Sequence, residues 1–337
     1  MIGEIANLAV WELFKLRRRW MVWILLLFAL LFAQLAVWGG FFSYRNLQES
    51  GGELAVPASL QPQPARAGRT VRCNDLLSGD PARQPTDLDA QVIAGFTAQC
   101  RQQATTLPAR LSRSYGTFTL PGSIPSALNT VQTLGLILMA ILTASAIGID
   151  YGTGTLRSVL TQGTGRWPYL TAKFLTLGLL CALGLIVAVA SVAASSAIAA
   201  GLATAPQSVG PSVTWSDAGV ALWKGWVSIL PYIALTAFVT VVARSSAAGM
   251  AIGLGYYFAE QLIVALLTNF FSWFQTVADF LLVRNISGWT GNAGGFPGAL
   301  PDQTHAIVVL SVYTLLLGGV AFWLFEKRDV QGATGSG

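Results

Sequence analysis

Side chains that could do chemistry are few in this sequence, and their spacing does not match a catalytic site. The single histidine, His305, has no cysteine, aspartate or glutamate cluster beside it, which favours an interfacial residue over a metal ligand. Two glycine-threonine runs, at 152–155 and 163–165, look like phosphate-binding loops, but both lack the lysine and the preceding strand that such loops need. We therefore expect no catalytic residue, no metal site and no cofactor held by this chain.

Glu260 stands apart because it lies inside an apolar stretch. It is about 14 residues, or roughly 20 Å of helix, from the inner end of that stretch. A carboxylate at such depth costs about 2.5 kcal/mol or more unless it meets water or a partner. Either it lies on a translocation path or at a polar contact between subunits, or it is a buried or snorkelling carboxyl with a structural bond. Before it, Gly249, Gly253 and Gly255 form a small-residue face that permits close approach of a helix or a subunit.

The composition indicates that most of this chain is solvated by lipid. Apolar residues make up 53% and charged residues 10% of the 337 residues, whereas a soluble domain carries about 25% charged residues. A globule with so few charges could not cover its surface. With a mean hydropathy of +0.58, the sequence excludes an ordinary soluble enzyme, a disordered chain and a disulfide-dense secreted module. The net charge of +5 then bears on membrane topology rather than on nucleic acid.

Six apolar stretches are long enough to cross the hydrocarbon core of a bilayer, about 30 Å thick, as helices. They are residues 20–42, 128–149, 170–200, 220–243, 247–268 and 306–325. The first is longer than the roughly 7–15 apolar residues of a signal peptide and lacks an obvious cleavage site, so we interpret it as a retained span. The predicted fold class is therefore all-α: a polytopic membrane protein with six transmembrane helices.

Basic residues are biased to one side of these spans. On that side lie Lys15, Arg17, Arg18, Arg19, Arg157, Arg166, Lys173, Arg244, Lys327 and Arg328. The short connections on the other side hold only Lys224 and Arg284. Because short cytoplasmic loops are enriched in lysine and arginine, we expect the leader 1–19 and the tail 326–337 in the cytoplasm of a plasma-membrane protein. We also expect Arg166 and Lys173 to lie among the cytoplasmic headgroups.

Residues 1–19 precede the first span. Apolar residues recur there at helical spacing and are followed by a basic cluster of Lys15, Arg17, Arg18 and Arg19. This pattern predicts an amphipathic helix that lies on the membrane, with the basic cluster as its anchor at the headgroups. The alternative is a flexible basic leader without regular structure.

Residues 43–125 form a large extracytoplasmic loop in this topology. Its first half is rich in proline, glycine, arginine and glutamine and is typical of irregular structure, whereas a helix is expected from Thr86. Cys73 and Cys100 are the cysteines outside a span, and both face the oxidising side. We therefore predict a disulfide between them; the alternative is two free thiols.

Residues 269–303 link the fifth and sixth spans on the outer side. An apolar stripe that includes Phe270, Trp273 and Val277 runs along a segment too short to cross the membrane. The pattern predicts a re-entrant or interfacial helix near the outer surface, followed by a glycine-rich turn at 291–298.

The cytoplasmic connection 150–169 is the most informative segment of the chain. An acidic residue, Asp150, ends the second span, and a threonine-capped turn leads into a short helix with Leu156, Val159 and Leu160 on its apolar face. A short amphipathic helix that projects into the cytoplasm has nothing of its own chain to bury against. A partner protein is therefore its natural cover.

The segment 149–173, together with two others, resembles the permease subunits of ATP-binding-cassette exporters, the type-2 ABC membrane family. The other two are 12–19, which reads Glu-x-x-Lys-Leu-x-Arg-Arg, and 325–329, which reads Phe-x-x-Arg-Asp. The number of spans, the large outer loop and the short helices before the last span match as well. The chain departs from the family in having Asp150 where many relatives have glutamate, and in lacking proline in the turn at 163–165.

The resemblance implies a coupling helix at about 155–162 that docks on a separate ATPase subunit, where ATP and Mg would bind. It assigns to the coupling segment Asp150, Gly152, Thr155, Leu156, Arg157, Val159 and Leu160. It also implies that two permease chains, identical or paired, form the export path, and that this chain is not itself an enzyme. Because the spans offer few polar groups, we expect an amphipathic or hydrophobic substrate.

Two other functions stay open at the level of sequence. An ATP-independent ion- or proton-coupled carrier would need several membrane-embedded charges or unwound helices, of which Glu260 is the clear example. A non-transporting scaffold or sensor would bind a ligand with its outer loop instead.

Overall fold

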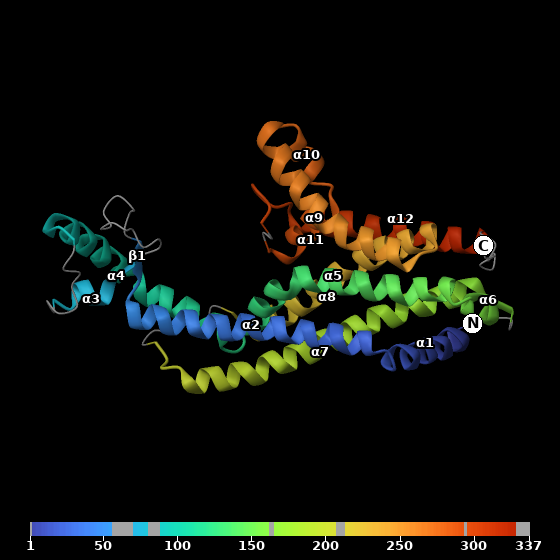
Figure 1. The fold of residues 1–337 in the computed structure, drawn as a ribbon, viewed down its shortest axis with the longest axis horizontal. Helices are drawn as coiled ribbons and strands as arrows, with labels where there is room; N and C mark the ends of the chain where they lie inside the picture. Colours follow the sequence, from blue (N-terminus) through green and yellow to red (C-terminus); the bar gives the residue numbers. More distant parts are fainter. Residues whose placement is uncertain are drawn as a thin grey trace. The chain divides into compact units, whose positions relative to one another are not determined.

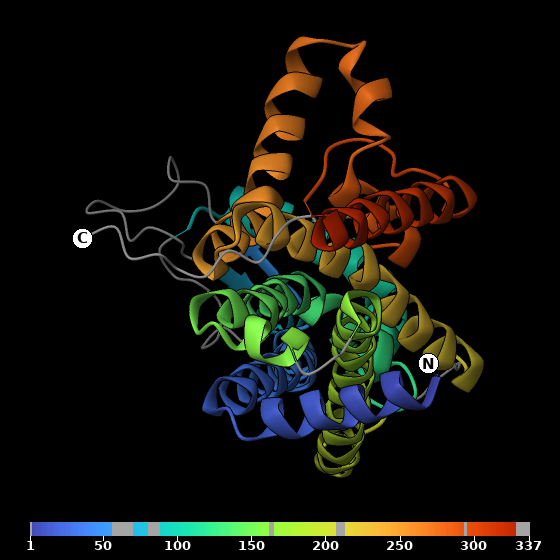
Figure 2. The same cartoon turned by 90° about the vertical axis from the view of Figure 1, so that its right-hand side faces the viewer.

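The computed structural model describes residues 2–55, 70–79, 88–161, 165–206, 213–292 and 295–327 (Figures 1 and 2). Within these ranges its helices are α1 (Ile2–Arg17), α2 (Trp20–Ser50), α3 (Cys73–Leu77), α4 (Ala90–Phe118), α5 (Ser123–Gly152), α6 (Thr155–Thr161), α7 (Arg166–Leu202), α8 (Trp215–Ala243), α9 (Ser246–Phe270), α10 (Phe274–Ala278), α11 (Leu282–Thr290) and α12 (Gln303–Lys327). Two short strands, β1 (Glu53–Ala55) and β2 (Thr70–Arg72), complete the described elements.

Six helices of the described ranges are long and apolar enough to cross a membrane. They are α2, α5, α7, α8, α9 and α12, and each contains one of the six apolar stretches found in the sequence. The prediction of an all-α polytopic membrane protein is therefore confirmed. The helices are longer than the stretches, as in α2, which continues to Ser50; hydropathy marks the lipid-facing part of a helix, whereas the backbone hydrogen bonds carry it further.

The chain divides into two compact units. The first comprises residues 1–33, 128–190 and 219–337, and the second comprises residues 34–127 and 191–218. The core of the first unit is apolar and contains fully buried side chains from α5, α8, α11 and α12. They include Leu136, Tyr232, Ile233, Leu282, Ile286 and Leu310.

Small residues bring α9 against α5 and α8 in the first unit. A Cβ added at Gly253 would lie 2.8 Å from Ala140 Cβ, and one at Gly249 would lie 2.1 Å from Thr240 Oγ1. Both distances are too short for a side chain, so these glycines are needed where the helices cross. Around Gly255, by contrast, an added Cβ would meet nothing within 4 Å.

The second unit contains the segments that follow α2. β1 and β2 pair antiparallel, with Glu53 opposite Arg72, and α3 follows β2 directly. Cys73 in α3 and Cys100 in α4 are joined by a disulfide with an S–S distance of 2.06 Å, which agrees with the predicted pairing. The sequence suggested irregular chain here and a helix from Thr86; the described part has these short elements, α4 begins at Ala90, and Thr86 lies outside the described residues.

The segment between α9 and α12 differs from the single helix that the sequence predicts. It forms two short helices, α10 and α11, separated by residues 279–281. α11 is buried along residues 282–288 and is ended by Gly291, whose φ of 76° suits glycine. The sequence pattern pointed to the apolar stripe in and before α10 and missed α11, because Arg284 and Asn285 interrupt its apolar pattern.

Candidate functional site: the ionic network around Asp150

Asp150, in the last turn of α5, lies at the centre of a buried polar network in the first unit. Its Oδ1 accepts hydrogen bonds from Lys15 Nζ at 2.7 Å and from Thr155 Oγ1 at 3.1 Å. Its Oδ2 accepts one from the Tyr169 hydroxyl at 2.6 Å and lies 2.5 Å from Lys173 Nζ. With four donors the buried carboxylate is fully satisfied, and it joins α1, α5, the start of α6 and α7 at one point.

Glu12 on α1 completes the charge balance of this network. Its Oε1 lies 3.2 Å from Lys173 Nζ and 3.7 Å from Lys15 Nζ, and its side chain is 3% exposed. Two acids therefore face two amines, which is the condition for burying charges without a large desolvation penalty. Lys173 Nζ also donates to the carbonyl oxygen of Ala146, at 2.9 Å.

The structure changes the sequence-based interpretation of two lysines. Lys173 is 2% exposed, so the expectation that it lies among the headgroups is wrong. Lys15 was expected to anchor the leader at the headgroups, whereas its amine pairs with Asp150. Tyr169, by contrast, had no predicted role. A signal was present: Tyr169 and Lys173 are four residues apart and share a face of α7.

Helix α6, the predicted coupling helix, packs against other parts of its own chain. Leu156 is 1% exposed and belongs to an apolar cluster with Tyr169, Leu170 and Phe325, against which Val159 also packs. The prediction that this apolar face has nothing of its own chain to bury against is therefore wrong, because the start of α7 and the end of α12 cover it. The exposed residues among those described are polar, namely Thr155, Ser158 and Thr161.

The two glycines before α6 differ in what their positions require. Gly154 has a φ of 68° and makes the turn between α5 and α6, whereas an added Cβ at Gly152 would meet nothing within 4 Å. The side chains of Arg157 and Leu160 lie outside the described part of the structure, as does the segment 162–164. Their assignment to coupling stays a prediction.

The start of α7 also holds the end of α12. Arg166 Nη1 donates to the carbonyl oxygen of Glu326 at 2.6 Å, and Trp167 Nε1 donates to Glu326 Oε2 at 3.1 Å. The rings of Trp167 and Phe322 lie 4.6 Å apart. In Figure 1, α1, α6 and the last, red turns of α12 accordingly lie at the same end of the first unit. The Arg328–Asp329 pair that contributed to the family resemblance is outside the described residues.

The remaining residues of the basic cluster lie where α1 ends and α2 begins. Arg18 is stacked on Phe14, with Cζ 4.7 Å from the ring centroid, and Trp23 Nε1 donates to the carbonyl oxygen of Arg17 at 2.9 Å. Exposed aromatic side chains, including Trp20 at 83% exposure, surround the junction. Aromatic and basic residues together are typical of a helix end at a membrane interface.

Glu260 makes a structural bond. The carboxylate is 4% exposed and accepts hydrogen bonds from the backbone N–H groups of Val283, at 2.9 Å, and Arg284, at 2.7 Å. These are the free donors at the start of α11, so Glu260 caps that helix from α9. This is one of the two interpretations that the sequence left open; a place on a translocation path stays a prediction.

His305 has a structural contact as well. Its Nε2 lies 2.9 Å from the carbonyl oxygen of Asp279, and its ring packs on Phe280 at a centroid distance of 5.2 Å. Among the residues that the structure describes, no three histidine, cysteine, aspartate or glutamate side chains gather as metal ligands would.

Together, six helices of membrane-spanning length, an amphipathic leader and a short polar-faced helix tied to the spans define an all-α polytopic membrane protein. The chain belongs to the ABC-2 family of transporter proteins, whose family model matches residues 6–330. It is thus a membrane-embedded permease component of an ATP-binding-cassette transporter. No curated protein matches the chain.

Proposed function

We propose that this chain exports an amphipathic or hydrophobic substrate across the plasma membrane and is driven by a separate ATPase subunit that binds ATP and Mg. Two permease chains, identical or paired, form the path, and both termini of each lie in the cytoplasm. The chain itself binds no cofactor and no nucleic acid. Its direct partners are the ATPase subunit, the second permease chain and the lipid bilayer.

The observation that carries this proposal is the set of bonds on Asp150. The carboxylate bonds Thr155 at the start of α6, Lys15 on α1 and both Tyr169 and Lys173 on α7. A force applied to α6 is thus passed to a leader helix and to two spans at once. Rigid-body movement of packed helices is a common way to switch access to a site.

The surface that α6 offers to an ATPase is its polar side. Leu156 is buried in the chain's own apolar cluster, while Ser158 and Thr161 are exposed. The buried face fixes α6 to the spans, and the polar face makes the contact with the ATPase. Such an interface can form and move without exposing an apolar surface to water.

The test is reconstitution of the full chain with its ATPase subunit in liposomes. Ser158→Trp alters the exposed polar side of α6 that we assign to the ATPase, and Arg157→Glu reverses a charge that the family resemblance assigns to the coupling segment. Ser158→Ala is the matched control. We expect the first two variants to lose transport and the stimulation of ATP hydrolysis by substrate, while Ser158→Ala keeps both. Unchanged coupling in both variants would show that α6 is not the docking helix.

An ATP-independent carrier has a separate test. The lone chain would have to move substrate in liposomes without ATP, and Glu260→Gln would have to abolish that movement. We expect no such transport, because the carboxylate is engaged by the backbone of α11.

A further inference from the structure

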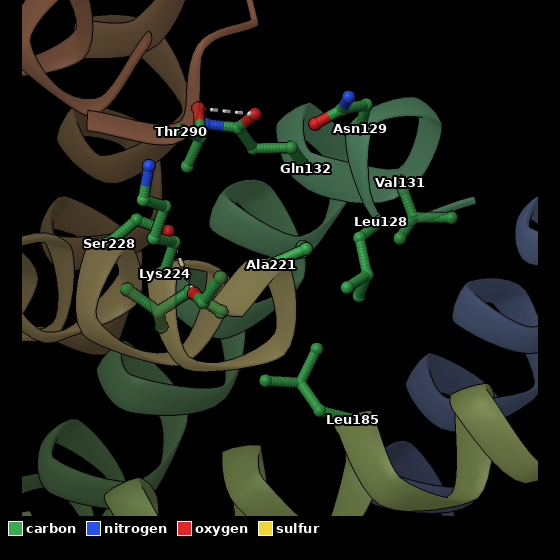
Figure 3. Close-up of a pocket in the computed structure, with 12 residues that line it drawn as sticks. Leu128, Asn129, Val131, Gln132, Leu185, Ala221, Lys224, Ser228 and Thr290 are labelled. Carbon is green, nitrogen blue, oxygen red and sulfur yellow. Dashed lines mark hydrogen bonds between the residues drawn. The ribbon is translucent and has the colours of Figure 1, made fainter. Parts of the chain in front are cut away.

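A cavity of about 60 Å³ lies in the first unit among α5, α7, α8 and α11, and neither the ionic network around Asp150 nor the Glu260 cap uses it. Figure 3 shows its lining side chains. The lining residues are Leu128, Asn129, Val131, Gln132, Gly135, Leu185, Ala221, Lys224, Gly225, Ser228, Ile229 and Thr290. One part of this lining is apolar, and the other carries an amine, two amides and hydroxyls.

In the apolar part of the lining, there is unfilled space beside two helices, α5 and α8. Leu128, Leu185 and Ile229 contribute branched side chains to it. At Gly135 of α5 and Gly225 of α8, an added Cβ would meet nothing within 4 Å. These glycines are therefore not needed for helix contact, and the space beside them can take the methylene groups of a ligand.

The polar part contains the cation Lys224, which has no acidic partner among the residues that the structure describes. Lys224 Nζ stands 5.4 Å from the centroid of the Trp289 ring, and none of the described carboxylates forms an ion pair with it. Beside it, Gln132 Oε1 accepts hydrogen bonds from Thr290, at 3.0 Å, and from Asn292, at 3.2 Å. Because these bonds use the carbonyl end of Gln132, its amide NH2 remains a donor in the polar part of the lining.

We propose that this cavity binds an anionic amphiphile. Its carboxylate or phosphate headgroup lies on Lys224 and Gln132, and the first part of its hydrocarbon tail lies against the apolar wall. A half-buried amine beside an apolar wall is stabilised by an anion that brings its own hydrocarbon. The volume suits a few methylene groups, so the rest of the ligand's hydrocarbon tail lies outside the cavity. The proposal rests on the proposed export function and narrows its substrate class; a resident bilayer lipid has the same chemistry.

Binding is measured on the full chain in phosphatidylcholine nanodiscs, with a fluorescent stearic acid and its methyl ester as probes and no ATPase present. We expect Lys224→Met to weaken binding of the acid about tenfold and to leave binding of the ester unchanged, while Lys224→Arg keeps both. Gly225→Leu fills the apolar part and should weaken both probes. The matched control is Gly219→Leu on the same helix, where an added Cβ also meets nothing within 4 Å and which does not line the cavity.

Two results would overturn the site. One is a Lys224→Met variant that binds the acid as the natural chain does; the other is Gly225→Leu that binds both probes as well as Gly219→Leu. Thermal unfolding of each variant shows that it is folded. Because no ATPase is needed, failure here leaves the export proposal standing, whereas lost coupling in the α6 variants would not affect this binding.

A transport arm distinguishes the two sources of the ligand. In proteoliposomes that contain the ATPase, ATP-driven movement of the bound acid identifies the ligand as the exported substrate. Binding with the same Lys224 dependence but without movement identifies it as a resident lipid. Both results support an anionic amphiphile at Lys224, and a ligand equally well replaced by inorganic phosphate would contradict the role of the apolar wall.

Discussion

Lys173 on α7 and Asp150 on α5 form a buried ion pair, with Nζ and Oδ2 2.5 Å apart and both side chains 2% exposed. Each group has further partners, Glu12 for the lysine and Lys15 for the aspartate, so the pair is part of a closed network. Such a network adds little net stability over apolar packing, but it has one good arrangement and therefore fixes how the helices meet. That property suits a junction that must transmit movement.

Removal of Lys173 tests how strongly the network depends on its charge balance. In Lys173→Met, Asp150 keeps Lys15, but Glu12 keeps only a 3.7 Å contact to Lys15. Leaving a buried charge poorly paired costs about 3–5 kcal/mol. We expect a clear fall in the melting temperature of the purified chain, measured by intrinsic tryptophan fluorescence. The double variant Glu12→Gln with Lys173→Met should recover part of the loss; equal loss in both would show that charge balance is not the cause.

Tyr169→Phe tests transmission with a smaller change. The substitution removes the 2.6 Å hydrogen bond to Asp150 and keeps the ring, which stacks on Phe325 at 6.1 Å. Loss of a hydrogen bond to a charged group costs about 1.5–3 kcal/mol. We expect the chain to fold and to bind its ATPase, but with weaker stimulation of ATP hydrolysis by substrate. Lys173 and Lys15 still hold Asp150, so stimulation should fall rather than vanish; full stimulation would contradict a coupling role for this bond.

The sequence predicts the spans well because apolar runs long enough to cross a membrane rarely form anything other than a transmembrane helix, as α9 and α12 illustrate. It could not predict which lysines are buried. Lys173 lies four residues from Tyr169, but its partners Glu12 and Asp150 come from other helices, and hydropathy carries no such information. Likewise the cover of Leu156 comes from Phe325, far along the chain. Contacts of this kind depend on tertiary packing, which local pattern does not encode.

The disulfide predicts a stability difference confined to the second unit. Cys73→Ser and Cys100→Ser each remove the bridge, whose loop closes over a sequence separation of 27, and such a loss costs about 2–4 kcal/mol. We expect faster proteolysis between α2 and α4 in either variant and in the natural chain under reductant. Cys181→Ser is the control, since that thiol is free and buried in the first unit. The natural chain should not react with maleimide at Cys73 or Cys100 without reductant.

The glycine contacts of α9 predict opposite outcomes for two neighbouring substitutions. At Gly253 an added Cβ would lie 2.8 Å from Ala140 Cβ, whereas at Gly255 it would meet nothing within 4 Å. Overpacking of a tight contact costs about 1–3 kcal/mol. Gly253→Val should therefore lower the melting temperature and the yield of folded protein, while Gly255→Val should do neither. If Gly255→Val is the more harmful, the face of α9 that contains it is covered by another chain in the membrane.

Substitution of Glu260 distinguishes a cap from a residue that contacts the substrate. The carboxylate gives one oxygen to each of two N–H groups of α11. Glu260→Gln keeps one acceptor and places an amide NH2 toward the other N–H, whereas Glu260→Ala leaves both donors buried and unpaired. An unpaired buried donor costs about 1–3 kcal/mol, so we expect the melting temperature to fall in the order natural chain, Glu260→Gln, Glu260→Ala.

The same variants carry the transport readout. If Glu260 acts through α11, ATP-driven transport should fall in step with the folded fraction, and the substrate concentration for half-maximal transport should not change. Limited proteolysis between α11 and α12 should rise in the same order as stability falls. Asp279→Asn is the control, because that carboxylate is 43% exposed and contacts only the Arg284 side chain among the ion pairs described. A Glu260→Gln chain of natural stability with altered substrate dependence would place the carboxylate on the path instead, since a residue that touches cargo changes binding without loosening the helix it caps.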